Sequence, residues 1–184
     1  MLGLINQKSG LNQISHINTI HKNKIKAGEI KYTNNELIDI LDFNKTDKYS
    51  RTELLGSIAA NEAIKNSGIK SINKYKTGLI SATTVGGMVN TEKYYLSNKI
   101  ENSSKNYIKS HHAGRSTEII ADSLNITDYI ATISTACSSA ANAIMLGARL
   151  IKSNQLDRVI VGGTDSLAKF TINGFNTLML LSEK

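Results

Sequence analysis

Residues 129–163, YIATISTACSSAANAIMLGARLIKSNQLDRVIVGG, carry the pattern that decides the fold. The runs at 128–135 and 157–166 have the length and the β-branched content of buried strands. The run between them, from Cys137 to about Lys152, is predicted to be a helix that is apolar on nearly all sides and therefore buried. Short connections of this kind produce a right-handed crossover between parallel strands. The stretch is expected to form one strand–helix–strand unit.

The rest of the chain continues this alternation. Residues 49–68 have apolar side chains at helical spacing and end on Gly68, a common helix stop. Residues 76–88 are predicted to be a buried strand with a glycine turn, whereas residues 90–110 are polar without a clean period. Further helices are expected at 34–41, at 115–125 starting from Ser116 or Thr117, and from Ala168 to Leu180. The predicted fold class is α/β, a mixed, largely parallel sheet covered by helices on both faces.

The composition limits the classes of function. The chain has 184 residues, of which 40% are hydrophobic and 20% charged, which fits one globular domain over residues 1–184. No apolar run reaches the roughly 20 residues of a membrane span, and the N-terminus lacks a signal-peptide pattern, so we expect a cytoplasmic protein without a membrane partner. The net charge of +7 comes with scattered lysines and only 5% aromatic residues. A nucleic-acid partner is therefore not expected.

Cys137 is the only cysteine, which excludes an internal disulfide and any multi-cysteine zinc site. It follows a predicted strand at the edge of the sheet where parallel strands end and functional groups gather. At the start of a helix, unpaired backbone N–H groups and the positive end of the helix dipole favour the nucleophilic thiolate. The alternative is that Cys137 fills space in the core, as lone cysteines often do. Both interpretations remain open from spacing alone.

The segment STACSSAANAI at 134–144 and the following ARLIKSNQLDRVIVGGTDS at 148–166 resemble the active-site region of the β-ketoacyl-[acyl-carrier-protein] synthases, ketosynthases of the thiolase-like superfamily. GLISATTVGGM at 78–88 is similar to an earlier strand and glycine loop of that family, and FNTLMLLSEK at 175–184 to a later segment. The resemblance covers about residues 45–184. It implies a thiolase-like α/β half.

The resemblance also implies a reaction and a site. In the family, the cysteine takes an acyl chain from acyl carrier protein as a thioester, and malonyl carrier then loses carbon dioxide and attacks it. Cys137 would be the nucleophile, with its own backbone N–H as one oxyanion donor. Thr83, Thr84, Gly86 and Gly87 would border the acyl pocket, although a plain turn is the alternative. Asp165 is expected to be a cap rather than an acid. No cofactor and no metal are implied, and the full-length protein would be a homodimer.

The sequence also departs from the family. A complete ketosynthase is about twice as long, and its two catalytic histidine motifs have no counterpart in these 184 residues. We therefore expect an N-terminal ketosynthase domain that is truncated at both ends, lacks the C-terminal half and is inactive in condensation by itself. His111 and His112 fall in a polar loop, KSHHAGRS, at no catalytic position of the family. Their expected role is structural.

Three other functions remain as alternatives. A thiolase would transfer acyl groups on coenzyme A, although the TACSSA motif favours the enzymes that use acyl carrier protein. A catalytically silent partner subunit of the chain-length-factor type typically lacks the cysteine, which Cys137 argues against. A flavodoxin-like binding domain would need a phosphate loop, and the sequence contains none. The acyl chain and the pathway, whether fatty acid, polyene or polyketide synthesis, stay undetermined.

Overall fold

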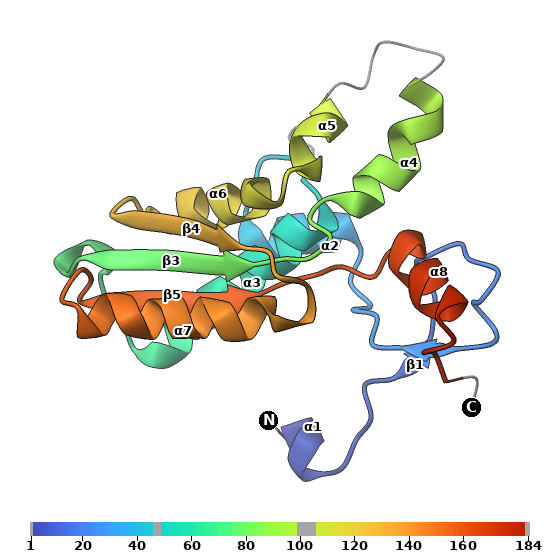
Figure 1. Ribbon diagram of the computed structural model, residues 1–184, viewed down its shortest axis with the longest axis horizontal. Helices are drawn as coiled ribbons and strands as arrows, with labels where there is room; N and C mark the ends of the chain where they lie inside the picture. The colour runs from blue at the N-terminus through green and yellow to red at the C-terminus, as the bar shows by residue number, and fades with distance from the viewer. Residues whose placement is uncertain (1, 46–48, 99–105, 183–184) are drawn as a thin grey trace. The chain divides into compact units, whose positions relative to one another are not determined.

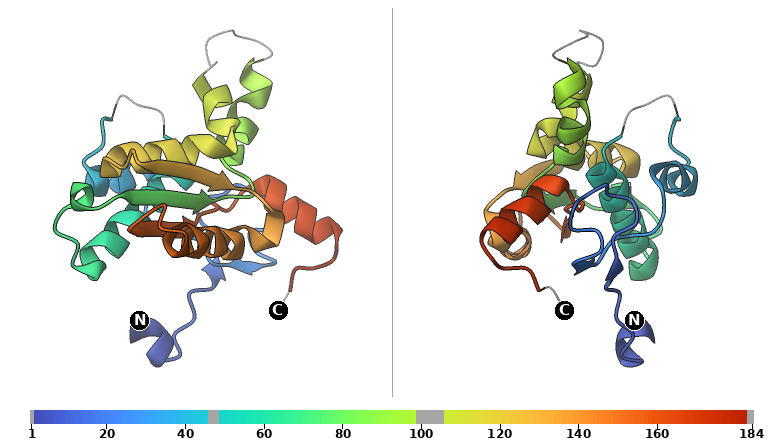
Figure 2. Two further views of the ribbon diagram at one scale, coloured as in Figure 1. Left: turned by 60° about the vertical axis from the view of Figure 1, so that its left-hand side comes forward. Right: turned by 90° about the vertical axis from the view of Figure 1, so that its right-hand side faces the viewer.

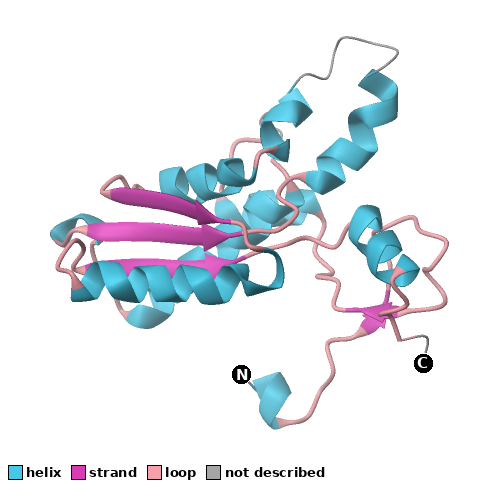
Figure 3. Cartoon of the chain, in the orientation of Figure 1, coloured by secondary structure: helices cyan, strands magenta, loops and turns pink. Residues whose placement is uncertain are grey.

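A computed structural model of the protein describes residues 2–45, 49–98 and 106–182. The chain divides into two compact units, one formed by residues 34–166 and the other by residues 1–33 together with 167–184. Figure 3 shows the mixture of helices and strands along the chain. The larger unit carries Cys137 and the segments that surround it.

The larger unit is built on a three-stranded parallel sheet with the order β4-β3-β5 (Figure 1). The strands are β3 (Thr77–Ala82), β4 (Tyr129–Ile133) and β5 (Arg158–Gly163), and Ile80 of β3 lies in register with Ala131 and Val161. All six residues of the central strand β3 are buried, as expected for a parallel strand that is covered on both faces. The predicted α/β class and parallel pairing are confirmed.

Helices cover both faces of this sheet (Figure 2). Successive β3 side chains point to opposite faces, so each face presents apolar side chains that a helix buries. On one face, Leu79 joins a cluster with Ile120 and Leu124 of α6 (Ala113–Leu124), against which α3 (Arg51–Ser67) also packs. On the other face, Ile80 packs against α7 (Ser139–Lys152). A further helix, α2 (Asn34–Leu41), packs on α3.

The ends of α3 follow directly from its sequence. The side chain of Ser50 accepts a hydrogen bond from the Glu53 amide, and the Glu53 carboxylate accepts one from the Ser50 amide, which together make a capping box. Gly68 ends the helix in the left-handed conformation, with φ of 71°. The predicted helix over 49–68 and its stop at Gly68 are confirmed.

The connection between β3 and β4 differs from the prediction. Two helices overlap the aperiodic stretch at 90–110, α4 (Met88–Asn98) and α5 (Asn106–His111). A short 3-10 turn, η1 (Ile72–Lys74), precedes β3. Helix α6 begins at Ala113 rather than at Ser116 or Thr117. The cause is His112, whose ring Nδ1 accepts a hydrogen bond of 3.1 Å from the Gly114 amide and so caps the helix three residues earlier.

The smaller unit holds a short antiparallel pair, β1 (Asn12–Gln13) and β2 (Lys26–Ala27), and two helices, α1 (Leu2–Ile5) and α8 (Lys169–Thr177). Ile14, Ile25 and Ile172 form its buried cluster. Helix α8 is shorter than the predicted 168–180 because the chain turns after Leu178 and Met179 takes a positive φ of 54°. Among the described residues, every helix is too short or too polar to span a bilayer.

Candidate active site

Cys137 lies in a 3-10 turn, η3 (Ala136–Ser138), which connects β4 to α7 at the carboxyl end of the sheet. The predicted start of the helix at Cys137 is therefore wrong by two residues, since α7 begins at Ser139. The Cys137 side chain is exposed. An exposed thiol contributes little to a core, so the packing interpretation of Cys137 is wrong for this structure.

Small hydroxyl side chains hold the turn around Cys137 in one conformation. The Thr135 amide donates to Ser139 Oγ over 2.8 Å, and Ser138 Oγ donates to the Thr135 carbonyl over 2.7 Å. Asn142, one turn into α7, donates from Nδ2 to Thr135 Oγ1 over 2.8 Å. The residues on both sides of the thiol are thus fixed by side chains of the turn itself and of the first turn of the helix.

Ala136 adopts the left-handed conformation, with φ of 53°, which a residue with a Cβ enters only when its surroundings enforce it. Its carbonyl oxygen accepts hydrogen bonds from the Ser139 amide, from Ser139 Oγ over 2.7 Å and from Thr84 Oγ1 over 3.2 Å. The residue directly before Cys137 is therefore held by its own helix and by the loop that follows β3.

The four residues predicted to border an acyl pocket have different surroundings. Thr84 is exposed and reaches the cysteine turn through Ala136, whereas Thr83 is buried. Gly86 has a positive φ of 51°, and a Cβ on Gly87 would lie 2.0 Å from the Ser110 carbonyl oxygen. The structure brings Thr84 to the cysteine turn, and the two glycines make the tight turn against the end of α5 possible.

The prediction that Asp165 is a cap is wrong. Its carboxylate accepts hydrogen bonds from Thr83 Oγ1 and from the amides of Thr84 and Val85, all in the loop after β3. It caps no helix, because α8 begins at Lys169 with Ala168 as its N-cap. The only sequence signal for this role is that Asp165 directly follows a predicted strand.

The side chains of three of the four histidines have structural partners. His111 Nδ1 pairs with Thr91 Oγ1 over 3.0 Å, His112 caps α6, and His16 Nε2 pairs with the Lys31 carbonyl over 2.7 Å. These contacts agree with the structural roles expected for His111 and His112. Within residues 2–45, 49–98 and 106–182, no three His, Cys, Asp or Glu side chains form a group that could hold a metal ion.

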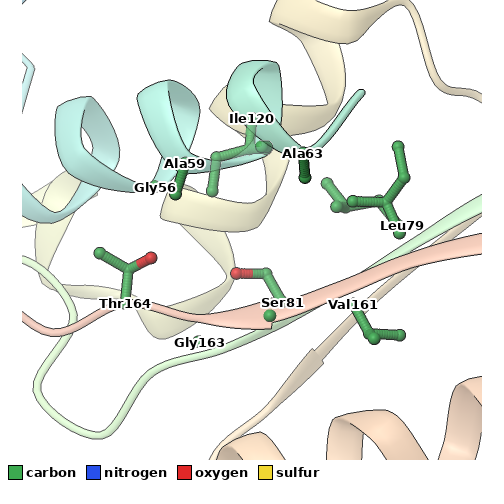
Figure 4. A pocket seen from close by; sticks show the side chains of 12 residues that line it. Gly56, Ala59, Ala63, Leu79, Ser81, Ile120, Val161, Gly163 and Thr164 are labelled. Atoms are coloured by element: carbon green, nitrogen blue, oxygen red, sulfur yellow. The ribbon is translucent and has the colours of Figure 1, made fainter. Parts of the chain in front are cut away.

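A hollow in the larger unit lies on the opposite face of the sheet from α7 (Figure 4). Its floor is β5 and its wall is α3, and small side chains create the space. The residues that line it include Gly56, Ala59, Ala63, Gly163 and Thr164. Cys137 does not line it, so this hollow is separate from the thiol.

Close packing fixes α7, and with it the cysteine turn, on the sheet. A Cβ on Gly163 would lie 3.1 Å from the Ala140 side chain, and one on Gly147 would lie 2.7 Å from Val161. The absence of side chains at these glycines lets the helix approach the strand. Contrary to the prediction of a fully buried helix, α7 leaves Ile144, Met145 and Ile151 exposed.

The fold and the site define the class of protein: an α/β half-domain in which a parallel strand delivers an exposed cysteine to the mouth of a helix. The chain matches the family described as beta-ketoacyl synthase, N-terminal domain, over residues 4–184. The protein therefore belongs to the β-ketoacyl synthase family, a family of transferases. The family expected from residues 134–144 is confirmed.

Solved structures of ketosynthases have the same fold. The ishigamide ketosynthase/chain length factor gives a TM-score of 0.88 at 19% identity, covering 100% of this chain and 47% of that one. The ketosynthase ApeO in complex with its chain length factor ApeC, from Xenorhabdus doucetiae, gives 0.63 at 30% identity, covering 79% and 37%. A complex of the type II polyketide synthase carrier protein with its hexaketide-bound ketosynthase, AntDE:AntF, gives 0.75 at 19% identity, covering 97% and 44%.

The chain thus spans less than half the length of these three structures. No curated protein matches it.

Proposed function

We propose that Cys137 accepts an acyl group as a thioester from an acyl carrier protein, in the first half of a β-ketoacyl synthase reaction. The observation that supports this most strongly is the exposed thiol in a turn that is fixed on both sides at the carboxyl edge of a parallel sheet. A nucleophile needs access to its substrate and a defined direction of approach. The turn offers both.

In the proposed transfer, the Cys137 thiolate attacks the carbonyl carbon of the carrier thioester. A new carbon–sulfur bond forms, the bond to the carrier sulfur breaks, and the carrier thiolate leaves and takes up a proton. The backbone N–H of Cys137 would donate to the oxyanion that forms at the carbonyl oxygen. A donor of this kind contributes about 3–4 kcal/mol to transition-state stabilisation where its removal has been measured.

In the second half, malonyl carrier would lose carbon dioxide, and the carbanion would attack the Cys137 thioester. A carbon–carbon bond then forms, and the bond from the acyl carbon to Cys137 breaks, which regenerates the thiolate. Residues 1–184 lack both histidine motifs that the family uses for this half. We therefore assign the complete condensation to a homodimeric ketosynthase of the relatives' length, with residues 1–184 as its N-terminal domain.

Polyketide-type chain extension is the setting that the relatives favour. The three solved structures include ketosynthases with chain length factors and one with a type II polyketide carrier protein. By the same resemblance, an acyl carrier protein is the proposed partner of this chain. Fatty acid synthesis is the alternative setting.

The test is acylation of the purified chain by an acyl carrier protein loaded with a short acyl group, followed by intact mass spectrometry. The wild-type chain is expected to gain one acyl group that hydroxylamine removes, since hydroxylamine cleaves thioesters. Cys137→Ser is expected to lose this thioester, while Ser67→Ala, at the exposed end of α3, retains it. An unmodified wild-type chain would contradict the proposal.

The second candidate is a silent partner subunit of the chain-length-factor type. Two of the similar structures contain such a subunit, which favours this candidate. A folded wild-type chain that takes no acyl group but forms a stable complex with a complete ketosynthase would support it over catalysis.

A further inference from the structure

We infer that Asp165 is a positioning residue for Cys137, acting through Thr84 on the carbonyl of Ala136. This inference rests on the proposed acylation of Cys137. It adds a residue from the end of β5 to a site that the sequence places on β4 and α7. The contacts that carry it are hydrogen bonds among residues at the carboxyl ends of all three strands.

The first step is the way the Asp165 carboxylate organises the loop after β3. Oδ1 accepts from Thr83 Oγ1 over 2.5 Å, from the Thr84 amide over 2.9 Å and from the Val85 amide over 3.2 Å, and Oδ2 accepts from the Thr84 amide over 3.1 Å. The Gly86 amide donates to Thr83 Oγ1 over 3.0 Å. Successive backbone N–H groups directed at one carboxylate form an anion-binding nest, so Asp165 fixes this loop.

The second step is the link from the loop to the cysteine turn. Thr84, whose amide Asp165 holds, donates from Oγ1 to the Ala136 carbonyl oxygen. Ala136 is the left-handed residue directly before Cys137. The Ala136 carbonyl and the Cys137 N–H belong to the same peptide group, and a peptide group is planar. Holding that carbonyl therefore also sets the direction of the Cys137 N–H, the proposed oxyanion donor.

The third step is the place of these residues at the sheet ends. The Thr83 amide donates to the Ile133 carbonyl, and the Thr164 amide to the Ala82 carbonyl, so the ladder continues one residue beyond each strand pair. The backbone next to Asp165 is therefore held in place by the sheet. Both Asp165 and Thr84 are exposed, so neither side chain is explained by filling the core.

The inference is tested with two substitutions, Asp165→Ala and Thr84→Val, and the chain offers a matched control for each. Asp157 is another exposed aspartate, and it lies just before β5. It accepts a hydrogen bond of 2.8 Å from the Lys76 amide at the opposite end of the same strands. Thr91 is another threonine whose hydroxyl has one side-chain partner, His111, away from Ala136. Asp157→Ala and Thr91→Val therefore repeat the chemistry of Asp165→Ala and Thr84→Val elsewhere.

The experiment measures two second-order rates at Cys137 in each variant. Acylation by hexanoyl-N-acetylcysteamine passes through an oxyanion, whereas alkylation by iodoacetamide does not. Asp165→Ala and Thr84→Val are each expected to slow acylation about 10-fold or more, the size of effect that a misplaced reacting group causes. Alkylation in all variants, and acylation in the two controls, is expected to stay within about 3-fold of the wild-type rate.

The double variant tests whether Asp165 acts through Thr84. If it does, Asp165→Ala combined with Thr84→Val is no slower in acylation than the slower single variant. Effects that multiply in the double variant, or an Asp165→Ala chain that acylates at the wild-type rate, would overturn the inference. Equal loss of acylation and alkylation would also overturn it, because a general loss of structure explains that result.

The failure of this inference differs from the failure of the proposed function. A wild-type chain that hexanoyl-N-acetylcysteamine does not acylate contradicts the proposed function itself. A wild-type chain that is acylated, with both variants equally fast, contradicts only the positioning role. If Asp165→Ala fails to fold, Asp165→Asn takes its place as the test of the carboxylate. Thr84→Val still tests the contact to Ala136, because it alters no charge.

Discussion

The turn that carries Cys137 stores backbone strain in a single residue. Ala136 has φ of 53°, and its carbonyl is held by Thr84 and Ser139. A β-branched side chain adopts this conformation at greater cost than alanine, while glycine adopts it freely. Ala136→Val is therefore expected to lower the free energy of unfolding by about 1–2 kcal/mol relative to Ala136→Gly. Urea unfolding followed by circular dichroism measures the difference; equal stability of the two variants would show that the turn relaxes.

A second residue-scale prediction concerns Glu29 in the smaller unit. Burial raises the pKa of its carboxyl group, but hydrogen bonds from Lys31, Ser15 and the His16 amide outweigh burial and lower the pKa to about 2. The ordinary value is 4.5, so the charged carboxylate stabilises the fold above about pH 4.5, and this contribution is lost as the pH falls toward 2. Because the partner Lys31 is about half exposed, solvent screening limits this contribution to about 1 kcal/mol.

Carbon-13 NMR of the Glu29 carboxyl group checks this prediction, with an expected midpoint near pH 2. At pH 6, Glu29→Gln is expected to destabilise the smaller unit, whereas Glu62→Gln, which removes an exposed carboxylate on α3, leaves stability within about 0.5 kcal/mol. A midpoint close to 4.5 would show that the hydrogen bonds to Glu29 do not persist in solution.

Local and distant contacts explain which residues of the site the sequence could predict. Cys137 was predictable because its strand, its turn and its helix are contiguous in the sequence, and the small residues around it mark the turn. Asp165 was not, because its partners Thr83 and Thr84 are more than 80 positions away and meet it only once β5 pairs beside β3. A single sequence contains no signal for that pairing.

At the scale of elements, the contact between α7 and β5 depends on Gly147. A Cβ there would lie 2.7 Å from Val161 Cγ1 and 2.9 Å from Val159 Cγ1, and these β-branched strand residues have little freedom to move. Gly147→Ala is expected to lower the free energy of unfolding by about 1–2 kcal/mol, although alanine favours a helix. The matched change Gly174→Ala, in α8 with open space around it, is expected to raise it by about 0.5–1 kcal/mol.

Denaturant titration of both variants measures these opposite effects. A stabilised Gly147→Ala chain would mean that helix propensity outweighs the contact with β5. It would also mean that α7 shifts on the sheet without cost.

Helices and strands with strong periodicity or end signals were predictable, and those without them were not. The helix over 49–68 has a capping box and a glycine stop, so both its ends follow from local contacts. The stretch at 90–110 has no clean apolar period, and α4 and α5, which overlap it, escaped prediction. The start of α6 escaped for another reason, since an imidazole cap from His112 is rarer than a serine or threonine cap.

At the scale of the whole molecule, the sheet and both of its apolar clusters belong to one unit, formed by residues 34–166. The cysteine turn, Thr84 and Asp165 also belong to it. The prediction of a parallel sheet with helices on both faces needed only the order of the elements. The right-handed crossover and the burial of both sheet faces then limit the possible arrangements. The division into two units depends on which segments meet in space, and the element order does not contain that information.

The last prediction separates the two halves of the proposed reaction. In the proposed reaction, acylation of Cys137 needs the thiol, its turn and an added acyl thioester, and residues 1–184 contain the first two. Condensation also needs groups that promote decarboxylation of malonyl carrier, and the family's two histidine motifs are absent from these residues. The 184-residue chain is therefore expected to form the acyl thioester and to release no β-ketoacyl product when malonyl carrier is added. Mass spectrometry of the carrier protein checks for the product, with a complete ketosynthase as the positive control. Steady turnover by residues 1–184 would mean that another residue of this chain, such as His111 or His112, takes the place of the missing histidines.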